Sequence, residues 1–438
     1  MLKAIRLTLL LSLLIAALLA FEAQAATSTV TVLTVKGTIN PVLAEYITSG
    51  IARAEENNST CVIIQMDTPG GLDTAMRDIV KSIVNARIPV VVYVSPPGAR
   101  AASAGVFITV AAHVAVMAPD TNIGAAHPVS IGTEGEATMS STMEEKVVND
   151  AAAYIRSLAE GRARNIEWAE KAVRESVSAT EQEALKLNVI DLVSPSLADL
   201  LTQLDGRQVT LLGGQIATLN TQGAAINYVN MTVIENFLNA IADPNIAYIL
   251  LSLAILGITA EIFNPGAIFP GLIGGICLLL AFYSLGMLPV NYTGVLLIVL
   301  AFGLFIAEVF THSFGVLTIG GLTSLILGSL ILFKGGPLFQ VSPWLIALVA
   351  TIILAFVTFV VSRVIRVHRR QPYSGNEELV GKTAVVRAAL DPEGMVLFKG
   401  ERWTAISESG RVEPGEEVVI QKVDGLKLYV TKDKKGGE

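Results

Sequence analysis

Two short segments carry the residue types that acyl transfer needs. Met66-Asp-Thr-Pro-Gly-Gly-Leu72 ends a predicted strand with the glycines Gly70 and Gly71. Because glycine lacks a Cβ, the N–H groups of such a turn can point into a cleft that a substrate approaches closely. Ser95-Pro-Pro-Gly-Ala-Arg-Ala-Ala-Ser-Ala-Gly105 places Ser103 among small residues at the start of a predicted helix. A reachable serine beside N–H groups that could hold an oxyanion predicts nucleophilic catalysis.

Plainer interpretations exist for each segment taken alone. The small residues around Ser103 could serve close helix packing, and Gly70-Gly71 could form an ordinary turn. Ser95 is the nearest rival nucleophile, but Pro96 and Pro97 would leave it in an extended loop without N–H donors. The combination of the two segments favours catalysis by Ser103, with Gly70 lining the substrate cleft.

Composition limits the classes of protein that the chain can belong to. Of its 438 residues 52% are hydrophobic and 16% are charged, against about 25% charged in soluble domains. The net charge of -7 argues against a nucleic-acid binder. Cys61 and Cys277 have no Cys or His neighbours at metal-ligand spacing, so we expect no zinc site, disulfide framework or cofactor.

The elements that would position these residues lie in a predicted α/β domain, residues 26–230. Short β-branched runs alternate there with helical patterns, which is typical of a largely parallel sheet. A long helix is predicted from about Met143 to Arg164, after a Gly/Ser/Thr-rich stretch, 130–142, that could gate the cleft. The predicted strands are 29–35, 61–66 and 89–94, and the earlier helices are 41–57, 72–85 and about 101–112.

Residues 245–362 have the pattern of a membrane region. Their only charges are Glu261, Glu308 and Lys334. Apolar runs separated by short polar or Pro/Gly breaks predict about five spans. Their approximate ranges are 246–263, 267–288, 293–310, 315–333 and 343–361.

Flanking sequences predict the orientation of the spans. Residues 1–25 have the charged start, apolar run and Ala-x-Ala site of a signal peptide. Arg363, Arg366, Arg369 and Arg370 follow the last span, which places that end in the cytoplasm. An odd number of spans then puts the α/β domain outside the cytoplasm, in an integral, multi-pass membrane protein.

A weak repeat relates Ala260-Glu-Ile-Phe263 to Ala307-Glu-Val-Phe310, 47 residues further on. This offset, about one hairpin of spans, indicates a duplication. The repeated glutamates, Glu261 and Glu308, could line a polar path through the bundle. We favour the simpler interpretation that each lies near a span end, because a charge facing lipid costs about 2.5 to 3.5 kcal/mol.

The tail, residues 376–434, contains five short alternating runs separated by Gly, Pro and Asp turns. This spacing predicts a small five-stranded barrel of the OB type. Its basic and acidic residues nearly cancel and it has few aromatics for base stacking, so we expect it to bind protein and no nucleic acid.

The order of these motifs, with Gly124-Ala-Ala-His-Pro128 further on, resembles the long form of the NfeD membrane proteases, which are related to Clp peptidases and signal peptide peptidase A. The resemblance implies a Clp/crotonase-like α/β protease domain, an all-α multi-span bundle and an all-β OB-like barrel. It places the nucleophile on Ser103 and the oxyanion donors on the backbone of Gly71 and Ala104.

The general base remains open between two residues. The resemblance places a Ser-Lys dyad on Lys146, whose amine must be desolvated to accept a proton. Without the resemblance, Lys146 reads as an exposed lysine paired with Asp150. His127 lies about where Clp peptidases carry their triad histidine, but Arg174 and Glu175 stand where the orienting aspartate is expected. We favour Lys146 and keep His127 as the alternative base, or as a cleft or packing residue.

The sequence thus predicts a membrane-anchored, ATP-independent serine endopeptidase. The resemblance implies a stomatin- or prohibitin-like membrane partner and cleavage of apolar segments, and we also expect contact with membrane lipid and a homo-oligomer. A catalytically silent scaffold for a stomatin-like assembly is the main alternative. A crotonase-like acyl-CoA enzyme and a transporter are weaker ones.

Overall fold

The computed structural model describes residues 28–128, 141–263, 266, 268–311, 315–334, 336–368 and 379–433. The predicted signal peptide and most of the predicted stretch 130–142 lie outside these ranges. The chain divides into two compact units, Met1–Val357 and Thr358–Glu438.

A six-stranded parallel sheet forms the centre of the α/β domain. Its strands are ordered β11 (Ala225–Val229), β1 (Thr29–Lys36), β2 (Cys61–Asp67), β3 (Val90–Val94), β5 (Val114–Met117) and β8 (Leu192–Val193). The central strands are almost wholly apolar because both faces of the sheet are covered.

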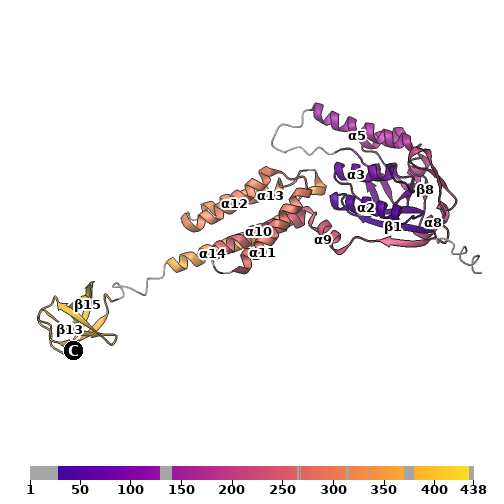
Figure 1. Ribbon diagram of the computed structural model, residues 1–438. Helices are drawn as coiled ribbons and strands as arrows, with labels where there is room; N and C mark the ends of the chain where they lie inside the picture. Colours follow the sequence, from indigo (N-terminus) through magenta and orange to yellow (C-terminus); the bar gives the residue numbers. More distant parts are fainter. Residues whose placement is uncertain are drawn as a thin grey trace, which may run out of the picture. The chain divides into compact units, whose positions relative to one another are not determined.

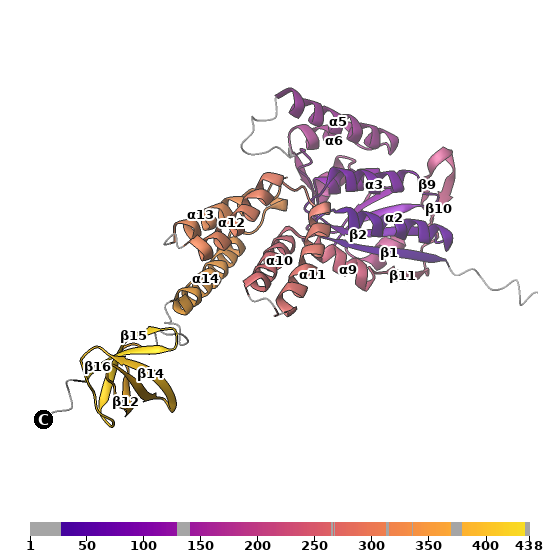
Figure 2. The ribbon, with the colours of Figure 1, turned by 60° about the vertical axis from the view of Figure 1, so that its left-hand side comes forward.

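Alternate residues of these strands enter two cores. Leu33, Ile64 and Val92 belong to the larger core, on the side of five helices (Figure 1). Val32 and Ile63 belong to the smaller one, with α8 (Leu197–Leu204) and the β9 (Gln208–Thr210)–β10 (Ile216–Thr218) hairpin. The five helices are α2 (Pro41–Glu56), α3 (Asp73–Val84), α4 (Ala104–Ala111), α5 (Ser141–Gly161) and α6 (Ile166–Arg174), and Figure 2 shows α5 and α6 beside each other.

A second, small sheet leads into the helix that begins after Ser103. Strand β4 (Arg100–Ala102) pairs with β6 (Asn122–Gly124), which pairs with β7 (Ser178–Thr180). The helix predicted from about residue 101 therefore begins only at Ala104. Arg-Ala-Ala has no intrinsic preference for a strand, and its extended conformation follows from pairing with distant residues.

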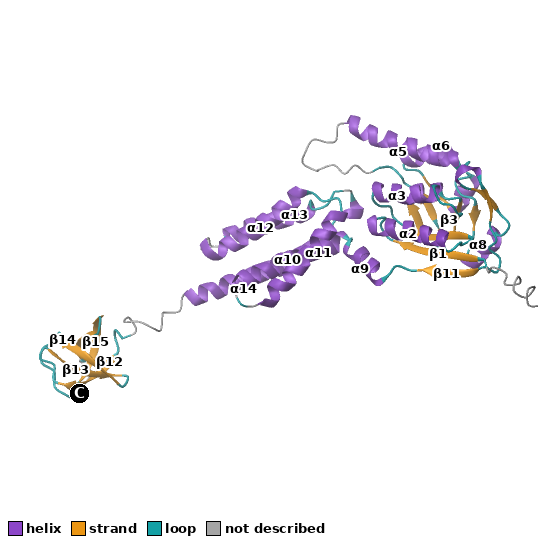
Figure 3. Ribbon diagram, in the orientation of Figure 1, coloured by secondary structure: helices purple, strands orange, loops and turns teal. Residues whose placement is uncertain are grey.

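Among the described residues between Val233 and His368 the named elements are all helices, joined by loops (Figure 3). After α9 (Val233–Ile241) come α10 (Pro244–Phe263), α11 (Ile268–Met287), α12 (Tyr292–Thr311), α13 (Val316–Leu330) and α14 (Pro343–His368). Within the described residues, α10, α11, α12 and α14 are long and apolar enough to cross a membrane. The predicted fourth span, 315–333, forms a helix of only 15 residues, α13.

The duplication seen in the sequence recurs in the packing of the two hairpins α10–α11 and α12–α13. A Cβ added to Gly274 would lie 2.9 Å from the carbonyl of Ala254. The residues 47 positions later, Gly321 and Ala301, repeat the contact at 3.0 Å. Small residues allow this close approach of helices within a membrane.

The repeated glutamates occupy matching places but differ in their hydrogen bonds. Glu308 is 5% exposed, and its carboxylate accepts the N–H groups of Gly315 at 2.8 Å and Thr318 at 3.0 Å, at the start of α13. Glu261 lies against Gly271 near the start of α11. Its Oε2 is buried and has no hydrogen-bond partner among the described residues. Glu308 thus caps a helix, in keeping with a place near a span end.

The tail forms a closed barrel of five strands in the order β12-β13-β14-β16-β15, as the sequence predicts. The third and fifth strands, β14 and β16, run parallel, and the other pairs are antiparallel. The strands are β12 (Thr383–Ala388), β13 (Glu393–Phe398), β14 (Glu401–Ser407), β15 (Glu417–Asp424) and β16 (Lys427–Lys432).

Candidate active site

Ser103 stands at a sharp turn between strand β4 and helix α4. Its backbone has φ 51° and ψ −112°, a conformation that costs a non-glycine residue about 1–3 kcal/mol and that clusters at functional sites. Its N–H donates to the carbonyl of Gly124 at 3.1 Å, which fixes the turn. No hydrogen bond of its Oγ occurs among the described residues, so the hydroxyl is available to a base or substrate.

Gly70 lies directly against the Ser103 side chain. A Cβ added to Gly70, whose φ is +124°, would lie 2.7 Å from the Cβ and 3.2 Å from the Oγ of Ser103. Both features require glycine at this position. The structure therefore brings the two predicted segments together.

Thr68 holds this turn and was missed by the sequence reasoning. It is fully buried, and its Oγ1 accepts the N–H of Gly70 and lies 3.1 Å from the carbonyl of Gly70. Its backbone pairs with the β4 strand through Arg100 and Ala102. Because threonine is a common turn former, its position before Pro-Gly-Gly was the available signal.

Gly71 and Ala104 supply N–H groups next to Ser103. Ile39 bonds to the residues on either side of Gly71, donating to the carbonyl of Gly70 at 2.8 Å and accepting from Leu72 at 2.9 Å. In this parallel bridge the N–H of Gly71 points away from Ile39. Ala104 is the first residue of α4, where an N–H has no acceptor within its own helix. No acceptor for either N–H occurs among the described residues, which leaves both available to an anionic oxygen.

Arginines from outside α4 cap its C-terminal end. Arg164 is almost fully buried and donates to the carbonyls of Val110 and Ala112, while its Nη2 lies 2.7 Å from Oδ2 of Asp191. Arg162 donates to the carbonyl of Ala111 at 2.9 Å. Cations at this end complement the helix dipole, so these contacts hold the helix whose other end bears Ser103.

Two residues considered from the sequence have structural roles. Asp67, whose place before the Gly-Gly turn suggests that it could brace that turn, instead accepts the N–H of Arg100 at 3.1 Å and braces the start of β4. Ser95 is 7% exposed and its hydroxyl lies 3.4 Å from the carbonyl of Tyr93. Its burial makes it a poor rival to Ser103.

Lys146 lies on the exposed first half of α5. Its predicted partner, Asp150, instead binds Arg77 on α3 at 2.5 Å. Arg77 also stacks over the ring of Tyr154, 4.5 Å from its centroid. These contacts fasten α5 to α3 and leave Lys146 without an ion pair among the described residues.

His127 is half-buried, and its Nδ1 lies 2.8 Å from the carbonyl of Val173. A carbonyl only accepts, so Nδ1 is the donor, and Nε2 is the ring nitrogen left to face a partner. A carbonyl stands here in the place of the carboxylate that orients histidine in a Ser-His-Asp triad.

Neither cysteine nor a metal cluster adds chemistry to this site in the described part of the chain. Burial raises the pKa of the Cys61 thiol to about 12, which makes it a poor nucleophile. The described ranges contain no group of three or more His, Cys, Asp or Glu side chains placed to hold a metal ion.

Comparison with known proteins assigns the three parts of the chain. Residues 29–229 match the NfeD1b N-terminal domain, residues 245–363 the NfeD integral membrane domain, and residues 376–432 the NfeD-like C-terminal, partner-binding domain.

Relatives align over almost the whole length. The membrane-bound protease PH1510 of Pyrococcus horikoshii is 38% identical over 92% of this chain and 93% of its own. The membrane protein NfeD1b of Bacillus subtilis is 29% identical over 93% and 94%. Among solved structures, the 1510-N membrane protease specific for a stomatin homolog from P. horikoshii is 34% identical and covers 50% of this chain and 100% of its own, with a TM-score of 0.43. The chain therefore belongs to the NfeD family and is an integral membrane serine protease, as the sequence predicts.

Proposed function

We propose that the chain is an ATP-independent endopeptidase in which Ser103 is the nucleophile and Lys146 the general base. The observation that carries the proposal is the contact of the strained Ser103 with Gly70, because the N–H groups of Gly71 and Ala104 belong to the residues that directly follow these two. Paired donors of this kind stabilise the oxyanion of acyl transfer.

These residues can supply and accept every proton that the reaction moves. The Oγ of Ser103 bonds to the scissile carbonyl carbon while neutral Lys146 takes its proton, and the oxyanion binds the N–H groups of Gly71 and Ala104. The C–N bond breaks as Lys146 returns the proton to the leaving amine. Lys146 then takes a proton from water, whose oxygen attacks the acyl ester. It returns this proton to the Oγ of Ser103 as the acid product leaves.

Lys146 must lose water before it can act as a base. It is exposed in the structure, and we infer that bound substrate covers it and removes its water. His127 is the alternative base, supported by its Nε2, which has no hydrogen-bond partner among the described residues.

Single-residue variants of the full chain separate these roles. Peptide cleavage should be lost in Ser103→Ala, fall at least 100-fold in Lys146→Ala and stay near the parent rate in His127→Ala. Lys186→Ala, an exposed lysine on α7 (Glu181–Lys186), is the matched control. Parent activity in Ser103→Ala would refute the proposal, and loss only in His127→Ala would transfer the base to that residue.

We further propose that the substrate is an apolar segment of a stomatin- or prohibitin-like membrane protein, and that this protein binds the C-terminal barrel. We also propose that the chain forms a homo-oligomer and that its protease domain is extracytoplasmic. The match of the barrel to a partner-binding domain supports a protein ligand, and Arg363 and the arginines after it support a cytoplasmic barrel. Co-purification of such a protein with the parent, but not with a chain ending at residue 375, is the expected result.

The alternative is a catalytically silent scaffold, which would bind the same partner but cleave no peptide bond. The strained Ser103 disfavours this alternative, because a binding domain has no need to keep such a conformation. Unchanged assembly with Ser103→Ala and no cleavage by the parent would support it.

A further inference from the structure

Helix α9, between the α/β domain and the first span, has two unlike faces. Val233, Ile234, Phe237 and Ile241 share one face, and Glu235 and Asn239 lie on the opposite one, as the helical period requires. A capping box formed by Thr232 and Glu235 fixes where the helix begins.

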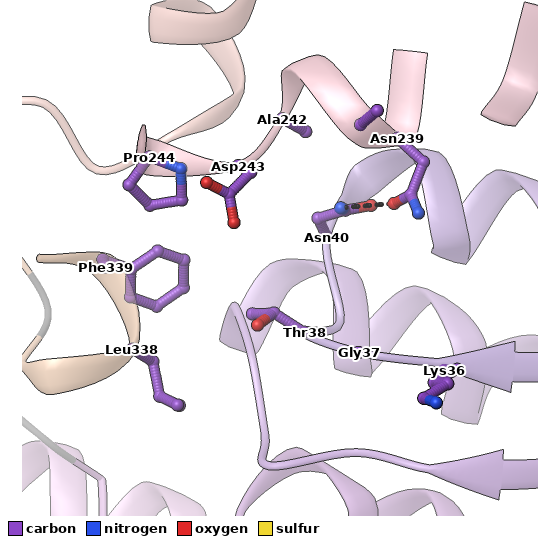
Figure 4. A pocket seen from close by; sticks show the side chains of 11 residues that line it. Lys36, Gly37, Thr38, Asn40, Asn239, Ala242, Asp243, Pro244, Leu338 and Phe339 are labelled. Atoms are coloured by element: carbon purple, nitrogen blue, oxygen red, sulfur yellow. Dashed lines mark hydrogen bonds between the residues drawn. The ribbon is translucent and has the colours of Figure 1, made fainter. Parts of the chain in front are cut away.

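The polar face of α9 binds the α/β domain. Oδ1 of Asn239 accepts from Nδ2 of Asn40 at 2.8 Å, and Glu235 lies 4.0 Å from Arg53. Figure 4 shows the Asn40–Asn239 bond at the edge of a cavity of about 230 Å³. Asn40 follows Ile39, the bridge partner of Gly71, so α9 is fastened close to the oxyanion turn.

The apolar face of α9 is buried at its C-terminal end only. Ile241 is 4% exposed, and its carbonyl accepts from Ser284 near the end of α11. Along the same face Phe237 is 49%, Ile234 70% and Val233 86% exposed. The stripe that packs on the bundle therefore continues beyond it without a protein cover among the described residues.

Leu338 and Phe339, just before α14, line the same cavity as Lys36 and Asn40, so this end of the bundle adjoins the α/β domain. Further contacts join the span ends at this level. The N–H of Ser342, before α14, donates to the side chain of Asn245 in α10, and Asn291, before α12, bonds to Leu332, after α13. Tyr292 and Trp344, at the starts of α12 and α14, are 79% and 86% exposed. Exposed Tyr and Trp at span ends mark the level of the membrane interface.

We propose that α9 is an interfacial helix whose face of Val233, Ile234 and Phe237 inserts into the lipid leaflet on the side of the α/β domain. The partner is phospholipid, because the exposed face continues a surface that already packs against the spans, at the level of Tyr292 and Trp344. The polar face is occupied by protein and carries no Lys or Arg, so insertion depends on apolar burial and not on anionic headgroups.

Site-specific labels in the full chain test this inference. Val233→Cys and Phe237→Cys would be labelled with the fluorophore NBD and reconstituted in phosphatidylcholine vesicles. The matched control is Asn236→Cys, an exposed residue on the remaining side of the same helix. The parent chain, treated identically, measures any reaction of the buried Cys61 and Cys277.

The expected result is blue-shifted emission at 233 and 237, with at least twofold stronger quenching than at 236 by lipids that carry a nitroxide high on the acyl chain. Added phosphatidylglycerol should leave the difference unchanged. Equal quenching at all three positions would overturn the inference, as would an unquenched label at 237 together with disulfide cross-linking of the unlabelled Phe237→Cys variant to a second copy. A second pair of variants, Phe237→Trp and Asn236→Trp, repeats the test with a smaller change to the side chain. Quenching of the new tryptophan by brominated lipids is the measurement.

Discussion

Ser103 and Gly70 form one unit at the scale of single residues. Both residues have positive φ values. The side chain of Ser103 lies so close to Gly70 that the Cβ of any other residue at position 70 would clash with it. The motifs in the sequence were enough to predict this pair, because glycine and serine in these settings have few other uses. Thr68 could not be assigned, since its burial and its bonds to Gly70 depend on pairing with β4.

Gly70→Ala should inactivate the protein. The new Cβ would lie 2.7 Å from the Cβ of Ser103, and a displacement of the nucleophile by about 1 Å can cost roughly 100-fold in rate. The matched control is Gly98→Ala, where φ is +85° but nothing lies within 4 Å of the new Cβ. It should lose stability through backbone strain and keep its kcat. Equal kcat in both variants would contradict the contact.

His113 should make the fold sensitive to acid. Burial, with Arg162 and Arg164 nearby, lowers the pKa of His113 from 6.5 to about 3, and its Nδ1 accepts the N–H of Val90. Between pH 6.5 and 3 the unfolded chain binds a proton that the folded chain refuses, so stability falls as the pH falls, by up to about 1.4 kcal/mol per pH unit.

His113→Asn keeps an acceptor for Val90 and removes the titration. Unfolding midpoints of parent and variant, measured in detergent from pH 8 to 4, should differ by a constant above pH 7 and converge below pH 6. Parallel curves over the whole range would show that His113 is not the group responsible.

At the scale of elements, α4 is held at both ends by residues distant in sequence. Ser103 and Gly124 fix its start, and Arg162 and Arg164 cap its end. The sequence predicted the helix itself but not these arginines, because their partners lie about 50 residues away and on other elements.

Arg164→Met should destabilise the α/β domain by about 3 to 5 kcal/mol, because it removes the buried ion-pair partner of Asp191 and the donor to two carbonyls. The control is Arg207→Met, which removes a half-buried arginine 3.8 Å from the other oxygen of Asp191 and should cost less than about 1 kcal/mol. Denaturant unfolding followed by the fluorescence of buried Trp168 measures both. Similar losses would contradict the assigned role of Arg164.

Glu308 should stabilise the second hairpin of the bundle. Glu308→Gln leaves one of the N–H groups of Gly315 and Thr318 without an acceptor, at about 1 to 3 kcal/mol. Glu261→Gln, its counterpart in the first hairpin, changes an Oε2 that has no partner among the described residues and should cost less. Thermal unfolding in detergent compares the two, and the reverse order would contradict the capping role.

At the scale of the whole molecule, the average composition combines three unlike parts. Residues 26–244 carry 14 basic and 23 acidic residues, 245–362 carry three charges, and the tail is nearly neutral. Charge and periodicity distinguish these parts in the sequence, and each predicted barrel strand is present. Helix α13 is shorter than its apolar run because residues 331–333 leave the helix and pair with the segment before α12, a contact that hydropathy does not reveal.

The general base was the least predictable part of the site. The residues between His127 and Lys146 contain no motif that fixes how far either side chain lies from Ser103. The surroundings of Lys146 and His127, an exposed helix face and a carbonyl of α6, come from tertiary packing alone.

Trapping of the acyl-enzyme tests the central claim most directly. The full chain would be mixed with an activated ester of an apolar peptide, quenched in acid within seconds and digested for mass spectrometry. We expect the added acyl mass on the fragment that contains Ser103, and no such adduct in the Ser103→Ala variant. An adduct on another residue, or cleavage by the parent with no adduct on Ser103, would contradict it.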